Sequence, residues 1–303
     1  MKHRQKQTKK GWLIMVCIGL VILVTGGFWA FNQFNAHQPA KPKIVHLTAI
    51  GDSLTYGVGD HPGKGGYPNL IRQKVNHSTH HITMTAANFG ISGETTNQIN
   101  HRVVSSPKLR NNIRRADVIT VTTGGNDMLH FLKANLAVQT RRDLSAKLQQ
   151  YATAYQTRVS RLLTNIRRLN KRVHIFVFGI YNPVYVYFPQ VSFINQAIQL
   201  NNRVTSRVVQ AQSRTYFISI NKKLSDGQYR TAKSREKLKQ RASGIGDQTL
   251  GANQLEKLLT GQGNTSNRYL STEDHFHPNR TGYQIMTNLL YRKMCQHLSW
   301  LKE

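Results

Sequence analysis

The chain has 303 residues, of which 39% are hydrophobic and 18% are charged, so it can bury a sizeable core in one main domain of about 250 residues. Its 42 Lys and Arg face only 13 Asp and Glu, and the formal net charge of +29 favours polyanionic surroundings such as anionic lipid, phosphate-rich polymer or nucleic acid. The only cysteines are Cys17, in an apolar N-terminal run, and Cys295 near the C-terminus, which excludes a fold held by intrachain disulfides.

The N-terminus combines a basic flank with an uncharged apolar run. Residues 1–10 carry five Lys or Arg and no acid, and residues 11–31 carry no charge. At about 1.5 Å per residue such a run crosses a hydrocarbon core of roughly 30 Å, and the positive flank predicts a cytoplasmic N-terminus. We therefore predict a transmembrane signal-anchor helix over 11–31, a linker over 32–43, and an extracytoplasmic domain over 44–303 in a single-pass cell-membrane protein. A cleaved signal peptide is the alternative, although its apolar region spans only roughly 7–15 residues.

Beyond the linker, short apolar runs alternate with helical patterns. Leu, Ile, Val and Tyr recur at three- and four-residue steps over 143–170, which predicts a helix, and Asn279 is a plausible N-cap for a final helix. This alternation predicts an α/β domain of three layers (α/β/α) around a parallel five-stranded sheet. The predicted strands are rich in Val, Ile, Phe and Thr and span residues 44–50, 82–89, 117–123, 173–179 and 215–220.

Residues 221–268 interrupt the alternation. The segment is basic, polar and punctuated by glycine, with room for one or two helices. We interpret it as an insertion on the surface of the domain.

Chemically capable residues follow the predicted strands. Ser53 follows the first strand, Gly93 the second and Asn126 the third, while Asp274 and His277 precede the last helix. In an open parallel sheet the carboxyl ends of the strands share one edge, where these residues can converge. A serine hydroxyl needs a base such as His277, which in turn needs an acceptor such as Asp274. The backbone N–H groups of Ser53 and Gly93 and the amide of Asn126 are candidate donors to a developing oxyanion.

Each of these signals has an ordinary structural alternative, since a Gly-Asp-Ser turn or an Asn in a turn commonly serves the backbone alone. Four motifs in a fixed order, however, resemble the SGNH, or GDSL-type, esterase and lipase family. They are "GDSLTYG" (51–57), "GISGETT" (90–96), "TGGND" (123–127) and "DHFHPN" (274–279).

The resemblance implies Ser53 as nucleophile, Asp274 and His277 as the rest of the triad, and Ser53, Gly93 and Asn126 as the oxyanion hole. It also implies a flavodoxin-like three-layer fold and no metal or organic cofactor. The chain is most similar to the membrane-anchored, lysophospholipase-type branch of Gram-positive bacteria. One departure is His275, at a position where relatives often carry a small residue.

The expected function is therefore a serine esterase or acylhydrolase that cleaves lipid or lysophospholipid-like esters. An O-acetyl esterase acting on cell-wall polysaccharide is the main alternative for the substrate. The expected partners are a small ester or lipid and an anionic membrane or cell-wall polymer surface, with no specific nucleic acid, and we expect a monomer. A non-catalytic polyanion-binding protein is a further alternative. The last alternative is a metal-dependent hydrolase that uses Asp274, His275 and His277, with His80 and His81.

Overall fold

The computed structural model describes residues 42–61, 65–79, 81–135, 140–187, 189, 192–241 and 267–301, together with individual helical positions between residues 12 and 29. The chain divides into two compact units, Met1–Pro42 and Lys43–Glu303.

In the first unit, the described residues are helical and their large apolar side chains, among them Trp12, Leu23 and Trp29, are exposed. The basic flank over 1–10, most of the linker over 32–43 and many positions of the predicted span over 11–31 lie outside the described residues. Within the described part of the chain, no helix has the length and apolar character needed to cross a membrane.

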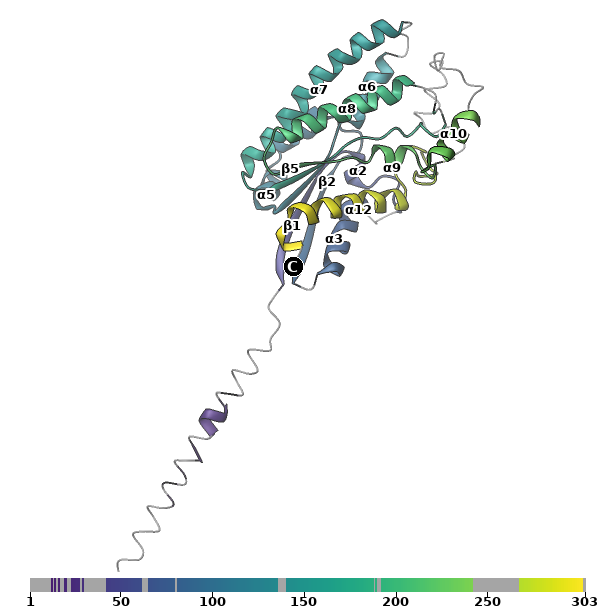
Figure 1. Cartoon of the computed structure of the whole chain (residues 1–303). Helices are drawn as coiled ribbons and strands as arrows, with labels where there is room; N and C mark the ends of the chain where they lie inside the picture. Colours follow the sequence, from purple (N-terminus) through teal and green to yellow (C-terminus); the bar gives the residue numbers. More distant parts are fainter. Residues whose placement is uncertain are drawn as a thin grey trace, which may run out of the picture. The chain divides into compact units, whose positions relative to one another are not determined.

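The second unit is built on a parallel sheet of five strands in the order β2-β1-β3-β4-β5 (Figure 1). This confirms the predicted α/β class with a parallel five-stranded sheet, and the order matches the flavodoxin-like arrangement. All four strand pairs are parallel. The strands are β1 (Lys43–Gly51), β2 (Ile82–Gly90), β3 (Val118–Thr122), β4 (His174–Phe178) and β5 (Thr215–Ile218).

Helices cover both faces of this sheet. The helices are α2 (Ser53–Tyr56), α3 (Gly66–Ser78), α4 (Thr96–Ser105), α5 (Pro107–Arg115), α6 (Gly125–Ala134), α7 (Arg141–Leu169), α8 (Ser192–Gln210), α9 (Asn221–Ser225), α10 (Ala232–Arg241) and α12 (Arg280–His297), followed by the 3₁₀ helix η1 (Ser299–Leu301). Helix α7 matches the helix predicted over 143–170. The Asn279 side chain caps α12 as predicted, since its Oδ1 accepts from Gly282 N at 3.1 Å.

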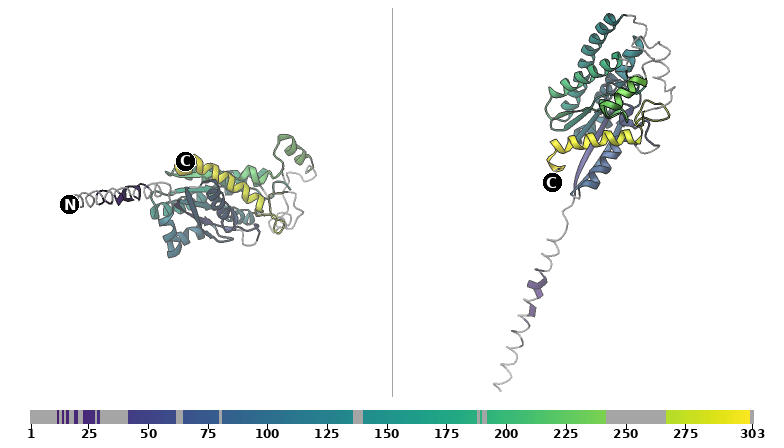
Figure 2. Two further views of the ribbon diagram at one scale, coloured as in Figure 1. Left: turned by 90° about the horizontal axis from the view of Figure 1, so that it is seen from below. Right: turned by 45° about the vertical axis from the view of Figure 1, so that its right-hand side comes forward.

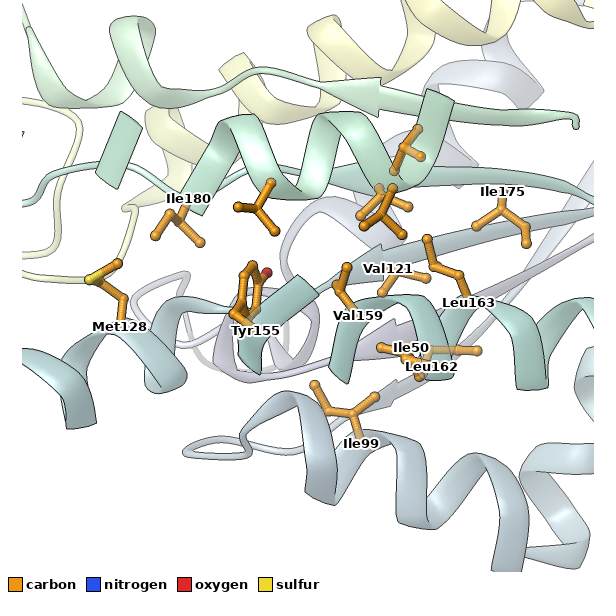
Figure 3. Packing of buried hydrophobic residues seen from close by; sticks show 14 of the residues in the cluster. Ile50, Ile99, Val121, Met128, Tyr155, Val159, Leu162, Leu163, Ile175 and Ile180 are labelled. Carbon is orange, nitrogen blue, oxygen red and sulfur yellow. The ribbon is translucent and has the colours of Figure 1, made fainter. Parts of the chain in front are cut away.

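Two hydrophobic clusters fill the spaces between the layers. One cluster joins α4, α5, α6, α7 and α8 to the sheet, and the other joins α3 and α12 to its opposite face. Figure 2 shows α12 and α7 on opposite sides of the sheet. In Figure 3, Val159 and Leu163 of α7 point toward Val121 of β3, and Leu162 lies beside Ile50 of β1. The central strand β3 is buried along its whole length, as the run "VITVT" leads one to expect for a strand covered on both faces.

The segment over 221–268 is less peripheral at its ends than the sequence suggested. Helix α9 begins directly after β5, and Leu224 within it is fully buried. Asn267, also fully buried, donates from Nδ2 to Leu224 O at 2.8 Å. Both ends of the segment therefore belong to the core, and residues 242–266 lie outside the described residues.

Candidate active site

The parallel topology brings the three predicted triad residues together. Ser53 opens α2 directly after β1, whereas Asp274 and His277 lie in the loop before α12. Ser53 Oγ donates to His277 Nε2 at 2.8 Å, and His277 Nδ1 donates to Asp274 Oδ2 at 2.5 Å. Both ring nitrogens of His277 are thus engaged, one with a hydroxyl and one with a carboxylate. A hydroxyl in this arrangement can pass its proton to the imidazole while the carboxylate stabilises the imidazolium that forms.

Asp52 fixes the turn that presents Ser53. The Asp52 carboxylate is buried, and its Oδ1 accepts from Leu54 N at 3.0 Å as the N-cap of α2 and from Thr122 Oγ1 at 2.7 Å. Burial raises the pKa of Asp52, while the hydrogen bonds from Thr122 and Leu54 oppose that rise. A Cβ at Gly51 would collide with Thr122 Oγ1, so the glycine permits β1 and β3 to approach at this point. The side chain at 52 ties the serine turn to the end of the central strand.

The loop that carries His277 is held by its own hydrogen bonds. Asp274 Oδ1 accepts from Phe276 N at 2.9 Å and from His277 N at 3.0 Å. Burial alone would raise the pKa of Asp274, but these bonds and the one from the His277 ring outweigh it and lower the pKa to about 2. Asp274 is therefore ionised throughout the neutral range.

Tyr181 supports this loop from the end of β4, and sequence reasoning did not single it out. Its hydroxyl donates to Phe276 O at 2.5 Å. Burial, followed by the charges of Asp274 and Asp52, raises the pKa of Tyr181 well above its ordinary value, so it remains a donor. Its position just beyond a predicted strand, at the same edge as the other residues, was the available signal.

The three predicted oxyanion donors lie in the segments that follow β1, β2 and β3. Ser53 is in the first turn of α2, where N–H groups have no intrahelical acceptor. Gly93 has φ +84°, which favours glycine, and a Cβ there would meet open space. The conformation, rather than crowding by protein atoms, therefore requires glycine at 93.

The amide of Asn126 is oriented by the backbone. Its Nδ2 donates to Glu94 O at 2.9 Å, which uses one of the two amide hydrogens. Glu94 is itself held by a salt bridge of 2.6 Å to Arg102, which also donates to Phe89 O at 3.1 Å. Sequence reasoning missed this Glu94–Arg102 pair, for which the sequence offers no local signal across eight residues.

His275 stands between the triad acid and base in a left-handed conformation, with φ +53°. A residue with a Cβ is strained there, and glycine is not. The difference from relatives at position 275 therefore lies in the backbone conformation, which favours glycine and here carries a histidine.

The described residues line two cavities, and neither lining includes Ser53, Asp274 or His277. One, of about 680 Å³, lies beside Thr95 and Asp127. Thr95 follows Glu94, which orients the Asn126 amide, and Asp127 follows Asn126 itself. The lining of this cavity includes the apolar or aromatic residues Phe131, Ala134, Tyr151 and Ala154. The other, of about 910 Å³, is lined by Tyr185, by amides and by charged side chains. The amides are Asn195, Gln196, Gln199, Asn221 and Gln240, and the charged residues are Lys222, Asp226, Arg235, Glu236 and Lys239.

The metal-binding alternative involves the same loop. Among the residues that the structure describes, no group of three His, Cys, Asp or Glu side chains is arranged to hold a metal ion. His80 lies outside the described residues, and His81 Nε2 lies 3.3 Å from Trp300 O. Cys295 is a free, half-buried thiol, whereas Cys17 is outside the described residues.

The family model described as GDSL-like Lipase/Acylhydrolase matches residues 47–290. The chain belongs to this family. This GDSL-like protein is a carboxylic ester hydrolase of the lipase and esterase type. It is 23% identical over 257 residues to the uncharacterized protein YpmR of Bacillus subtilis strain 168, and the match covers 85% of this chain and 84% of YpmR.

Solved structures share the fold of this GDSL-like hydrolase. The lipase Lip_vut3 from a goat rumen metagenome has a TM-score of 0.57 and 22% identity, over 81% of this chain and 95% of that one. The family 3 carbohydrate esterase of Clostridium thermocellum has a TM-score of 0.51 and 18% identity, over 86% of this chain and 99% of that one. At these identities the likeness concerns the fold alone.

Proposed function

We propose that this GDSL-like hydrolase cleaves carboxylic esters with Ser53 as nucleophile, His277 as general base and Asp274 as the acceptor that orients His277. The observation that carries the proposal is the continuous chain of hydrogen bonds from Ser53 Oγ through the imidazole to Asp274 Oδ2, at 2.8 and 2.5 Å. Such a chain gives the serine a base at hydrogen-bond distance and gives the base a fixed tautomer.

In the first step Ser53 Oγ attacks the ester carbonyl carbon while its proton moves to His277 Nε2. The carbonyl oxygen becomes an oxyanion, which accepts from Ser53 N, Gly93 N and the Asn126 amide. Each such donor contributes roughly 10²–10³ in turnover. His277 then returns the proton to the departing alcohol, which leaves an acyl-enzyme on Ser53. A water molecule, deprotonated by His277, attacks that acyl group and releases the acid with Ser53 restored.

For the substrate, we propose lipid or lysophospholipid-like esters as the first candidate. The cavity beside Thr95 and Asp127 supports it, because apolar and aromatic side chains from α6 and α7 form part of its lining next to the Asn126 turn, together with polar residues that include Lys147 and Arg158. A hydrocarbon chain bound there would be partly removed from water, which contributes about 25 cal/mol per Å².

The second candidate is an O-acetyl esterase acting on a polysaccharide. The amide-lined cavity of about 910 Å³ favours it, because amides both donate and accept hydrogen bonds, as a hydroxyl-rich ligand requires. Ser225 in its lining accepts from Asn182 N at 2.8 Å, one residue beyond Tyr181. The fold is compatible with either candidate, since a lipase and a carbohydrate esterase are both among its structural neighbours.

We further propose that the enzyme acts at the outer face of the cell membrane, anchored by residues 11–31, as a monomer near an anionic surface. The sequence pattern of residues 1–31 and the net charge of +29 support this location.

The decisive experiment compares the wild type with Ser53→Ala and, as a matched control, Ser78→Ala on the exposed end of α3. We expect Ser53→Ala to lose hydrolysis of a short-chain aryl ester and labelling by a serine-directed organophosphonate, while the control keeps both. Wild-type activity should persist in a chelator, unlike that of a metal-dependent hydrolase. Turnover by Ser53→Ala at the wild-type rate would refute the triad. A series of acyl esters run beside an acetylated glycan distinguishes the two substrate candidates.

A further inference from the structure

Acidic residues are scarce at one end of the strands of the hydrolase domain, although Lys and Arg occur at both ends. We define the amino edge as the segments that lead into four of the strands, residues 42–44, 114–117, 167–173 and 211–214. In Figure 1, α5 lies at this end of the sheet, whereas α2 and α9 lie at the other end. The amino edge contains a single acid, Asp117. Its Lys and Arg residues are Lys43, Arg114, Arg115, Arg167, Arg168, Lys171, Arg172 and Arg214.

Acids in the rest of the described domain lie toward the carboxyl ends of the strands. They include Asp52, Asp60, Glu94, Asp127 and Asp274, which are held in hydrogen bonds or ion pairs at or near the active site. Asp117 is also engaged, since its Oδ2 accepts from His46 N at 2.8 Å. The positive charge of the amino edge is therefore scarcely offset by acids, whereas the cations of α9 and α10 at the other end lie among acids such as Asp226 and Glu236.

The cations of the amino edge are crowded, and one is held in a strained conformation. Arg214 has φ +52°, where a side chain is disfavoured, and it donates from NH1 to Arg172 O at 3.0 Å. Burial, and next the charge of Arg214, lowers the pKa of Arg167. Arg214 therefore adds a cation beside Arg167 and Arg172 at a position where glycine would be unstrained.

An exposed apolar side chain lies at the same edge. Ile44, next to Lys43 at the start of β1, is 58% exposed. The chain that enters the domain at Lys43 carries exposed apolar helical residues, among them Trp12 and Trp29. Cations with an adjacent exposed apolar residue suit a bilayer interface, which attracts Lys and Arg by its anionic headgroups and accepts an apolar side chain. A purely polar polyanion offers no partner for Ile44.

We propose that the amino edge docks on an anionic phospholipid bilayer and thereby holds the active site away from it. Strand β1 has nine residues between Lys43 and Gly51, which corresponds to about 26 Å along the strand. Ser53 lies just beyond the far end. Resting on the proposed esterase function, the consequence is a narrower substrate class. The docked enzyme hydrolyses esters on water-soluble or polymer-borne carriers, which include a lysophospholipid that has left the bilayer, and a lipid ester that stays in the same bilayer is out of its reach.

The test measures the height of two sites on the full-length protein in vesicles. In a Cys17→Ser, Cys295→Ser background, Ser213→Cys marks the amino edge and Asn97→Cys marks the carboxyl ends of the strands. A donor dye that cannot cross the bilayer is attached after reconstitution, and energy transfer to an acceptor lipid is recorded for phosphatidylglycerol-containing and pure phosphatidylcholine vesicles. The edge variant replaces Arg114, Arg115, Lys171 and Arg172 by Gln. The matched control, with the same change in net charge, replaces Lys133, Arg142, Lys223 and Lys233 by Gln.

On anionic vesicles we expect Ser213→Cys to lie closer to the bilayer than Asn97→Cys by about 26 Å. The difference should vanish on phosphatidylcholine, in the edge variant, and as salt shortens the Debye length below about 8 Å, but it should persist in the control. The docking proposal would be overturned by equal heights of the two sites on anionic vesicles, or by a control variant that loses the difference as the edge variant does. It would also be overturned if a soluble polyglycerol phosphate, and not lipid, produced the difference in height.

A catalytic arm tests the substrate class separately. The docked enzyme should hydrolyse a soluble aryl ester at its usual rate and leave vesicle phospholipid intact. Cleavage of both at similar rates would overturn the inference. Energy transfer needs no catalysis and is repeated on Ser53→Ala. An inactive wild type with the expected heights would therefore refute the proposed function while leaving the docking intact.

Discussion

Replacing Asp274 by Asn separates the two tasks of this carboxylate. Oδ1 accepts from Phe276 N and His277 N at 2.9 and 3.0 Å, and an amide oxygen can continue to accept both bonds. Oδ2 accepts from His277 Nδ1 at 2.5 Å, and there the amide would present a donor. The imidazole would then turn its lone pair at Nδ1 toward the amide and carry its proton on Nε2, where Ser53 needs an acceptor.

The expected loss of activity is much larger than the loss of stability. A wrong tautomer lowers turnover by roughly 10³–10⁴, as in other Ser-His-Asp triads, which corresponds to about 4–5.5 kcal/mol in the barrier. The fall of the Asp274 pKa from 3.8 to about 2 corresponds to about 2.4 kcal/mol of folding free energy. Because the Asp274 side chain is 33% exposed, solvent screening reduces this to about 1–1.5 kcal/mol.

The assay is hydrolysis of a short-chain aryl ester, with the free energy of unfolding measured in urea on the same preparations. Asp274→Ala is the matched comparison, because it also removes the acceptor for the two loop N–H groups. We expect Asp274→Ala to be as inactive as Asp274→Asn and less stable than it by about 1–2 kcal/mol. Retention of more than a tenth of wild-type turnover by Asp274→Asn would refute the assignment of Asp274 as the partner of His277.

Three further predictions concern the same loop. His275→Gly should keep its activity and be more stable than His275→Ala by about 1 kcal/mol in urea unfolding, because only Gly relieves the left-handed strain at φ +53°. Activity lost to the extent seen in His277→Ala would identify His275 as the base. Tyr181→Phe should lower kcat several-fold with little change in KM, and it should reduce the free energy of unfolding in urea by about 1 kcal/mol. An unchanged kcat would mean that the bond to Phe276 O does not position His277. Since the pKa of Asp274 is lowered in the fold to about 2, its contribution to stability is present above pH 3.8 and lost as the pH falls through about 2; unfolding free energies should therefore decline less steeply in Asp274→Asn than in wild type over that range, and parallel declines would contradict the lowered pKa.

The sequence predicted the sheet well because each strand was a short, uninterrupted apolar run. The run "VITVT" is buried at every position, so no alternation was needed to recognise β3, and the long apolar stripe of α7 was equally clear. The N-terminal run is different. Its hydropathy predicts a span, but many of its positions lie outside the described residues, so the span stays a prediction.

The candidate site was predicted in part. Motif order predicted the roles of Ser53, Asp274 and His277. Their convergence could be expected because residues that follow the strands of a parallel sheet share one edge. The supports were not predictable in the same way. Tyr181 reaches Phe276 across 95 positions, and Asp52 reaches Thr122 across 70. Such contacts depend on strand register and side-chain direction, which residue type and local spacing do not determine.

Asp52 and Ser53 at the end of β1 have complementary roles in the same turn. Asp52 caps α2 through Leu54 N and accepts from Thr122 Oγ1 at 2.7 Å. Thr122 Oγ1 lies 2.8 Å from Thr55 Oγ1, which lies 3.0 Å from Tyr67 OH, so the buried network fixes both ends of α2 against the sheet. Ser53 carries none of these bonds and faces His277 instead. The structural role of the turn therefore falls on Asp52 and Thr55, which leaves the hydroxyl between them free to act in chemistry. For this reason a turn-capping role for "GDSL" and a nucleophilic role for Ser53 are complementary, and removal of the Ser53 hydroxyl should leave the turn in place.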